Sequence, residues 1–373
     1  MSPLDSGTGT ALVEVDPMRD PRWDTLVRHH RDAGTYHLGA WAGILRSAYG
    51  YRPLYLGLES PDGSLLGGLP MMRTRGPVTG RRLRSLPVVP PAGPLASSDE
   101  ELAQLLEGAC RRADEDEAKV WTLHSRVGAL ERLSHDLRWV PKHPTFVMGL
   151  GEDPDVVRRG WKKSASNIFR SVKKAEKDGV TVRPGTTEAD LRAFYGLYAR
   201  TMRRRRVLPR PYGQMAAARR LLPEGVFRLF LAEHGGEIVA GALWHSFGTT
   251  LDLLYAGSDE RKLDARPNHA LYWDAVRWGT ENGHTELDFG HAKPGSGLAH
   301  FKESWGAEPI QEYRYDYVPG APRTSLHTAD TSKSVIAPAR LLEGRESKNL
   351  VARAVERTPV RLLSAAGRVA YRL

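Results

Sequence analysis

The chain has 373 residues, of which 40% are hydrophobic and 26% charged, and its net charge is +10. This length exceeds the needs of one ordinary domain, so two domains with separate cores are expected. The single cysteine, Cys110, excludes an internal disulfide and a thiolate metal cluster, and no apolar run approaches the roughly 18 residues of a membrane span. The N-terminus also lacks the basic start and apolar core of an export signal, so a reducing cytoplasm is the expected location.

The first half of the chain, after an N-terminal stretch to about residue 11 that is expected to be disordered, suggests helices followed by a hairpin. Apolar spacing predicts helices beginning near 21 and 41, and residues 54–69 are typical of strand, glycine turn and strand. Residues 73–84 are expected to form a basic loop. A capped helix over 100–114 and a strand over 120–124 complete a first domain that is expected to span 12–144.

The positive charge is concentrated in the next part of the chain, a basic helical region over 158–222. Arg158 to Lys177 contains eight Lys or Arg and one acid, and Arg200 to Arg220 contains eight Arg and no acid. Few internal acids are available for pairing, so these faces are expected to bind a phosphate-rich partner rather than only to be solvated. The candidate phosphate-binding residues are Lys162, Lys163, Arg170, Lys173, Lys174, Arg203, Arg204, Arg205 and Arg206.

A second hairpin over 228–243 repeats the pattern of 54–69. Glu59 and Glu233 match at an offset of 174 residues, which two tandem copies of one fold would produce. A strand over 249–255, a helix over 267–282 and a strand at 286–289 follow within a second domain expected to span 145–318. Residues 319–373 form a linker and a basic amphipathic helical tail; two alternatives for the tail are packing on domain two and lying on an anionic membrane surface.

The most informative stretch is 286–317, where a strand enters a glycine-rich loop that is followed by Phe301-Lys302. It contains, in order, Asp288-Phe289-Gly290, Lys293, Gly297, Phe301-Lys302, Trp305-Gly306 and Pro309. This ordered set resembles the signature of the FemABX aminoacyltransferase family, whose relatives act in envelope and exopolysaccharide synthesis, and the resemblance extends more weakly over most of the chain. It implies an α+β fold of two tandem GNAT-like domains, each a mixed central sheet flanked by helices, with the C-terminal helical tail added.

The resemblance also implies a reaction: transfer of an aminoacyl group from an aminoacyl-tRNA to an amine of an envelope precursor, peptide or small metabolite. Negative charge develops on the ester carbonyl oxygen during such a transfer, and a fixed ammonium stabilises it. The family's Phe-Lys lysine corresponds to Lys302, and Asp288 is the candidate for orienting the amine or accepting a proton. The structural alternatives are a Lys302 that pairs with Glu303 or Glu308, and an Asp288 that caps a loop.

The other candidate substrate-binding residues match family positions or flank the motif: Phe301, Lys293, Gly290, His291, Tyr255 and Asn268. Packing and turn roles are the alternatives for Tyr255 and Asn268. The family usually has Arg-Ser where this chain has His291-Ala292, so the acceptor contact is in doubt there.

No cofactor is expected beyond the aminoacyl-tRNA co-substrate. A CoA-dependent GNAT enzyme holds the pyrophosphate in a glycine-rich loop, and the corresponding stretch, SDERKLDARPN, has no glycine. The histidines lack metal-binding spacing, so no metal is expected. Two alternative functions are an acyl-CoA-dependent N-acyltransferase of the same fold and a non-catalytic protein that binds nucleic acid or a membrane surface. For the location, the alternative to a purely cytoplasmic protein is one in peripheral contact with the inner membrane face.

Overall fold

The computed structural model describes residues 9–77, 79–134, 136–164, 166–321, 355 and 358–371. These residues form two compact units. The first contains 9–142, 312–321 and 368–371, and the second contains 143–311 with the described part of 349–367. The domain boundary expected at 144 therefore lies close to the first crossing of the chain between the units.

The first unit is built on a seven-stranded sheet with the order β1-β2-β3-β4-β5-β14-β6. All neighbouring strands are antiparallel except β4 and β5, which are parallel and are connected through helix α3 (Asp99–Glu115). The apolar side of α3 packs on one face of this sheet, against leucines of β2 and β3. The strands are β1 (Ala11–Val15), β2 (Arg52–Glu59), β3 (Leu65–Gly76), β4 (Gly80–Ser85), β5 (Trp121–Ser125), β6 (Arg138–Pro141) and β14 (Tyr313–Tyr317).

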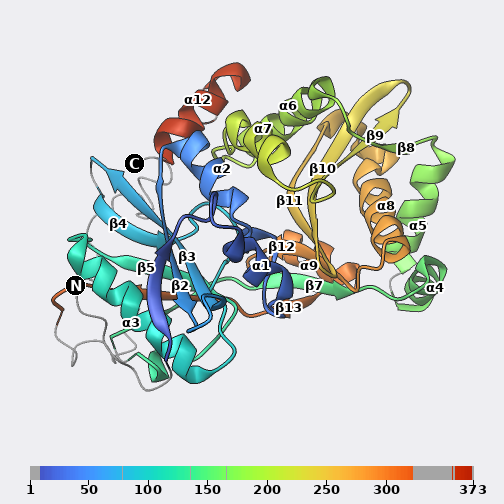
Figure 1. Ribbon diagram of the computed structural model, residues 1–373. Coiled ribbons are helices and arrows are strands. Elements are labelled where there is room, and N and C mark those ends of the chain that lie inside the picture. The colour runs from blue at the N-terminus through green and yellow to red at the C-terminus, as the bar shows by residue number, and fades with distance from the viewer. Residues whose placement is uncertain are drawn as a thin grey trace. The chain divides into compact units, whose positions relative to one another are not determined.

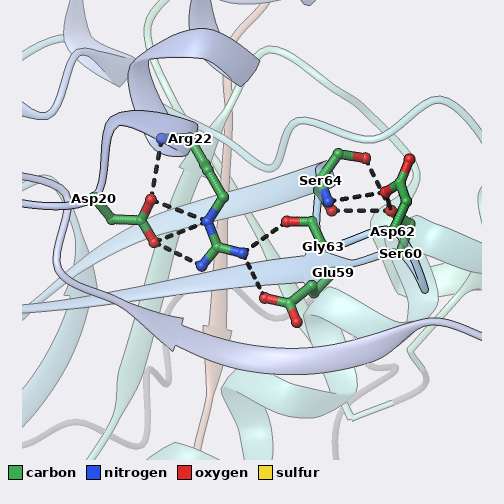
Figure 2. Close-up of polar contacts among 7 residues, drawn as sticks. All are labelled: Asp20, Arg22, Glu59, Ser60, Asp62, Gly63 and Ser64. Carbon is green, nitrogen blue, oxygen red and sulfur yellow. Dashed lines mark hydrogen bonds and ion pairs between the residues drawn. The ribbon is translucent and has the colours of Figure 1, made fainter.

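Helices α1 (Pro21–His29) and α2 (Ala40–Tyr49) belong to the opposite face, where the buried Trp23 ring meets Tyr55 edge-on at 4.8 Å. The first turn of α1 is tied to the β2–β3 turn by Arg22, as Figure 2 shows. Its guanidinium donates to the α1 cap Asp20, to Glu59 at 2.7 Å and to the carbonyl oxygen of Gly63 at 2.7 Å. One side chain thus fixes where the helix begins relative to the hairpin.

The second unit is built on another seven-stranded sheet, with the order β13-β7-β12-β11-β10-β9-β8. Here β11 and β12 are the parallel pair, connected through α8 (Pro267–Glu281). Helices α5 (Ser166–Lys177) and α8 cover one side, while α6 (Glu188–Arg204) and α7 (Tyr212–Leu221) cover the other (Figure 1). The strands are β7 (Thr145–Gly149), β8 (Thr181–Pro184), β9 (Phe227–His234), β10 (Glu237–Phe247), β11 (Thr250–Ser258), β12 (Glu286–His291) and β13 (Glu308–Ile310).

Two glycines on neighbouring strands let α6 approach the second sheet closely. Gly241 of β10 and Gly257 of β11 are register partners. A methyl group at Gly257 would lie 2.4 Å from the backbone nitrogen of Tyr198, and one at Gly241 would lie 2.7 Å from the Phe194 ring. The helix backbone therefore occupies the space that a side chain at Gly257 would need.

The two sheets repeat one plan. Each has an antiparallel hairpin (β2–β3 and β9–β10), then a parallel pair joined through a helix, then one strand from a distant part of the chain (β14 and β7), and last the strand that follows the parallel pair in sequence (β6 and β13). The predicted pseudo-duplication and the fold of two tandem mixed sheets flanked by helices are confirmed.

Several details differ from the sequence-based expectation. Residues 73–84 are mostly strand, because arginines alternate there along β3 and β4 instead of forming a loop. Strand β14 was assigned to the second domain, yet it pairs with β5 and β6, and Tyr315 is fully buried in the first core. The basic region begins with two helices, α4 (Pro154–Ser164) and α5. The tail is described only in part, as α12 (Val360–Ala370), and the remainder of the predicted linker and tail lies outside the described residues.

Candidate active site

The candidate site lies where the parallel pairing of β11 and β12 stops. The register runs from Thr250 and Glu286 to Asp252 and Asp288, and the pairing of β12 with β7 shifts immediately afterwards. Gly290 allows this break because its φ of 74° is in the left-handed region that favours glycine. The chain then turns into α9 (Gly297–Ser304), whose cap is the side chain of Ser296.

Asp288 holds the end of β12 in shape. Its carboxylate is 4% exposed and accepts hydrogen bonds from the Thr145 hydroxyl at 2.5 Å and from the Gly290 amide at 2.7 Å. Both of these donors are neutral groups. This geometry agrees with the alternative in which Asp288 shapes the loop, and it also provides a fixed anion beside the lysine described next.

Lys302 extends from α9 toward the same loop and is 4% exposed. Its Nζ donates to the carbonyl oxygens of Gly290 at 2.6 Å and His291 at 2.8 Å, and it lies 5.5 Å from the centre of the Phe146 ring. An ammonium has three protons, so these two contacts leave one for a further acceptor. The predicted pairing of Lys302 with Glu303 or Glu308 is not what holds it: backbone carbonyls do.

Burial lowers the pKa of Lys302 to about 8, although the negative charge of Asp288 raises it. The positive charge of Arg205 lowers the pKa further. The lysine is therefore mostly protonated at neutral pH and loses its charge in mildly alkaline solution.

This shift predicts how stability depends on pH. The unfolded lysine has a pKa near 10.5, so between pH 8 and that value the unfolded chain binds more protons than the folded chain. The free energy of unfolding should therefore rise with pH in this window, by at most about 1.4 kcal/mol per pH unit from this group. Denaturant unfolding of the wild type and of Lys302→Met between pH 7 and 10 measures the difference; parallel curves would contradict the assignment.

An aromatic cluster surrounds α9. The Tyr272 ring of α8 stacks on Phe289 at 5.5 Å and meets Phe301 at 5.4 Å and Trp305 at 5.7 Å. His269 joins this cluster 5.6 Å from Phe301, and burial lowers its pKa to about 4, so its ring is neutral at pH 7. The low-dielectric surroundings strengthen the field of the Lys302 ammonium at the loop.

The structure brings together five of the predicted residues, namely Asp288, Gly290, His291, Phe301 and Lys302. Lys293 is exposed in the turn before α9. Tyr255 contacts α6 and α7 instead, since its hydroxyl accepts from Gln214 at 3.1 Å and its ring lies 5.1 Å from Tyr198. Asn268 donates to the Ser258 hydroxyl at 3.4 Å at the start of α8, which agrees with its turn role.

Thr145 and Phe146 were not singled out from the sequence. They contact Asp288 and Lys302 from β7, more than 100 residues away in the chain, and nothing local in the sequence marks that pairing. The fold also places the His269 ring beside the site. The sequence gives one hint of this, because His269 directly follows the candidate residue Asn268.

The predicted basic residues occupy two different surfaces of the second unit. On α5, Lys173 lies over the Phe169 ring at 5.1 Å, Lys174 pairs with Asp178 and Arg170 contacts Asn167. Lys162 and Lys163 belong to α4, but their side chains lie outside what is described.

Arg203 and Arg204 end α6, and Arg205 and Arg206 follow it. Arg204 pairs with Glu260 at 3.3 Å, whereas the charge of Arg205 acts on Lys302. Of the two basic surfaces, the α6 end is thus the one that is electrically coupled to the candidate site.

The described part of the chain offers neither a metal-binding group of side chains nor a membrane-spanning helix. No three His, Cys, Asp or Glu side chains among these residues are grouped so as to hold a metal ion. No described helix is long and apolar enough to cross a membrane.

The comparisons with known proteins agree with this architecture. Residues 162–303 match the family model described as an acetyltransferase (GNAT) domain. A curated relative, the UDP-N-acetylmuramoylpentapeptide-lysine N(6)-alanyltransferase of Weissella viridescens, is 23% identical over 125 residues, and the match covers 34% of this chain and 37% of the relative. The aligned part thus spans little more than a third of the relative's length.

Solved structures resemble the chain over most of its length. FemX superposes with a TM-score of 0.68 at 16% identity, covering 82% of this chain and 97% of FemX. L-PGS from Bacillus licheniformis gives a TM-score of 0.55 at 14% identity, with 91% and 98% coverage. With two sheets of the same plan and a GNAT match in the second, the chain has the fold of two GNAT-like domains in tandem and resembles FemX in that fold.

Proposed function

We propose that this protein is an acyltransferase that moves an aminoacyl group from an aminoacyl-tRNA to an amine, forming an amide. The observation that carries the proposal is the buried Lys302 ammonium, fixed by two backbone carbonyls at the break between β11 and β12. The similarity to FemX and to an alanyltransferase supports the aminoacyl class of donor.

The reaction needs no covalent enzyme intermediate because the tRNA ester is already activated. The acceptor nitrogen attacks the ester carbon, a C–N bond forms and the carbonyl electrons move to oxygen. The remaining proton of Lys302 donates to this oxyanion and stabilises it as the charge develops. Collapse then breaks the bond to the ribose oxygen, which takes up the proton lost by the amine. The tRNA is the co-substrate, and no further cofactor takes part.

The donor is best explained as RNA. The segment from Ser258 to Asn268, between β11 and α8, contains no glycine and enters α8 through Arg266 and Pro267, so it lacks the flexible backbone that wraps a CoA pyrophosphate. The arginines at the end of α6 supply positive charge of the kind that contacts a phosphate backbone, and Arg205 links that charge to Lys302. The basic face of α5 covers the other side of the second sheet, and we include it as a second surface for RNA.

The acceptor is an amine, and by analogy with the alanyltransferase a lysine side chain of a cell-envelope precursor is the first candidate. Free peptides and small amine metabolites complete the candidate set.

A single assay tests the donor and the bond. Purified protein is mixed with total tRNA that carries radiolabelled amino acids and with a panel of amine acceptors that begins with a lysine-containing UDP-N-acetylmuramoyl pentapeptide. Label should move to an acceptor in a product that resists mild base, as an amide does and an ester does not, and RNase treatment beforehand should abolish the transfer. Transfer from acyl-CoA that survives RNase would contradict the proposal.

A further inference from the structure

A pocket of about 920 Å³ lies in the first unit, at one end of its sheet. Strand β2 begins opposite β3 at Arg52 and Arg73, whereas β3 and β4 remain paired as far as Gly76 and Gly80. The β3–β4 hairpin therefore extends past the start of β2 and leaves a notch beside it. Five arginines line this notch: Arg52, Arg73, Arg75, Arg81 and Arg82.

Strand alternation places four of these arginines on one face of the sheet. Arg52 is in phase with Leu54 of β2, Arg73 and Arg75 are in phase with Met71 of β3, and Arg81 is opposite Arg75; the leucine and methionine belong to the core under α3. Helix α3 ends at Glu115, and Glu115 and Asp116 line the same pocket. The arginines therefore lie on the part of this face just past the end of α3.

This arrangement opposes the stability of the sheet. Arg52 is directly opposite Arg73, and Arg75 is directly opposite Arg81. Like charges at directly opposed positions of an antiparallel pair are destabilising. Two such pairs on adjacent strands concentrate positive charge beside the notch.

Nearby acids neutralise only part of the charge. Arg73 pairs with Asp116 at 2.6 Å and with Glu14 at 3.4 Å, and Arg81 pairs with Glu117 at 2.8 Å. The side chains of Arg52 and Arg75, which are both exposed, make no hydrogen bond or ion pair with any residue that the structure describes. Two guanidinium groups are therefore available to an incoming anion.

We propose that this pocket binds a ligand that carries a diphosphate or two neighbouring phosphate groups, with Arg52 and Arg75 as its principal contacts. A guanidinium presents a planar fork of donors that matches phosphate oxygens, and a bound diphosphate would neutralise both opposed arginine pairs. The volume is in the range of small-molecule sites, and the buried residues Tyr49 and Tyr51 form part of the lining. A nucleoside diphosphate and a phospholipid headgroup share this chemistry.

The test uses the full chain and inorganic pyrophosphate as the probe in titration calorimetry. The double variant Arg52→Gln/Arg75→Gln should bind pyrophosphate at least about tenfold more weakly than the wild type, because two charge-assisted contacts are lost. The matched control is Arg19→Gln/Arg31→Gln, which removes the same charge from side chains that are 89% and 85% exposed, and it should bind like the wild type. Equal loss in both variants, or no heat with the wild type, would overturn the proposal.

Stability provides a second readout. Without phosphate and at low salt, the double variant should melt at a higher temperature than the wild type because like charges have been removed, and pyrophosphate should raise the melting temperature of the wild type alone. Two further probes identify the source of the ligand. Binding of uridine or adenosine diphosphate that depends on the two arginines supports a soluble ligand, and cosedimentation with phosphatidylglycerol vesicles that depends on them supports a lipid headgroup. A melting temperature that pyrophosphate raises equally in both proteins would contradict the site.

Discussion

Replacing Lys302 by alanine should reduce aminoacyl transfer by about 100- to 1000-fold in kcat, the usual cost of removing one group that stabilises an oxyanion. The reason is electrostatic: the ammonium is almost fully buried and fixed by Gly290 and His291, and a water that entered the space left by alanine would carry no charge. The measurement is the single-turnover rate with saturating charged tRNA and acceptor, which separates the chemical step from binding.

Two variants control this experiment. Lys119→Ala removes an exposed lysine and should change the rate less than threefold. Lys302→Arg retains the charge but brings a larger, planar group into a closed site, so it should recover only part of the activity. Because the alanine variant also loses two hydrogen bonds to the loop, its melting curve must show a folded protein at the assay temperature. Full transfer rate in a folded Lys302→Ala protein would exclude the assigned role.

Replacing Gly257 by alanine should lower the free energy of unfolding by about 2 to 4 kcal/mol, as forced overpacking of a rigid core does. The added methyl group would meet backbone atoms of Tyr198 at 2.4 and 2.5 Å, and a helix backbone cannot move aside as the end of a side chain can. Helix α6 would have to separate from β11. Equilibrium denaturation in urea measures the change.

The matched control is Gly196→Ala in the same helix. A methyl group there meets only the end of Arg200, at 3.5 Å, and alanine favours a helix interior over glycine by about 0.5 to 1 kcal/mol. The two Gly→Ala changes should therefore have opposite signs. If Gly257→Ala were neutral, the close contact between α6 and β11 would be wrong.

The fold could be predicted from the sequence wherever the signal was local. The two hairpins each carry a glutamate, a glycine turn and an apolar run, and their matching spacing revealed the duplication. Strand β14 lies within the informative stretch at 286–317, but its partners could not be predicted, because pairing with β5 about 190 residues earlier leaves no mark in the neighbouring sequence. The basic stretch at 73–84 was misassigned because arginine is an unusual strand residue, and the alternation was hidden among like charges.

The candidate site was likewise predictable only where its signal is local in the sequence. The ordered motif was sufficient to place Asp288 and Lys302 beside one loop, and the structure brings them there. The hydrogen-bond partners of Lys302 could not be predicted, because every residue has a backbone carbonyl. Only the turn at Gly290 directs the carbonyls of Gly290 and His291 at the same ammonium. Thr145 and the aromatic cluster depend on tertiary packing in the same way.

The position of β14 between β5 and β6 has a consequence for biosynthesis. The first sheet takes its sixth strand from residues 313–317, which leave the ribosome only after the whole second sheet has been translated. The N-terminal half must therefore wait with a missing strand and with the site of Tyr315 unfilled, as a partly folded nascent chain. A gene fragment that stops at residue 142 should yield an aggregation-prone product, even though it encodes most of one lobe.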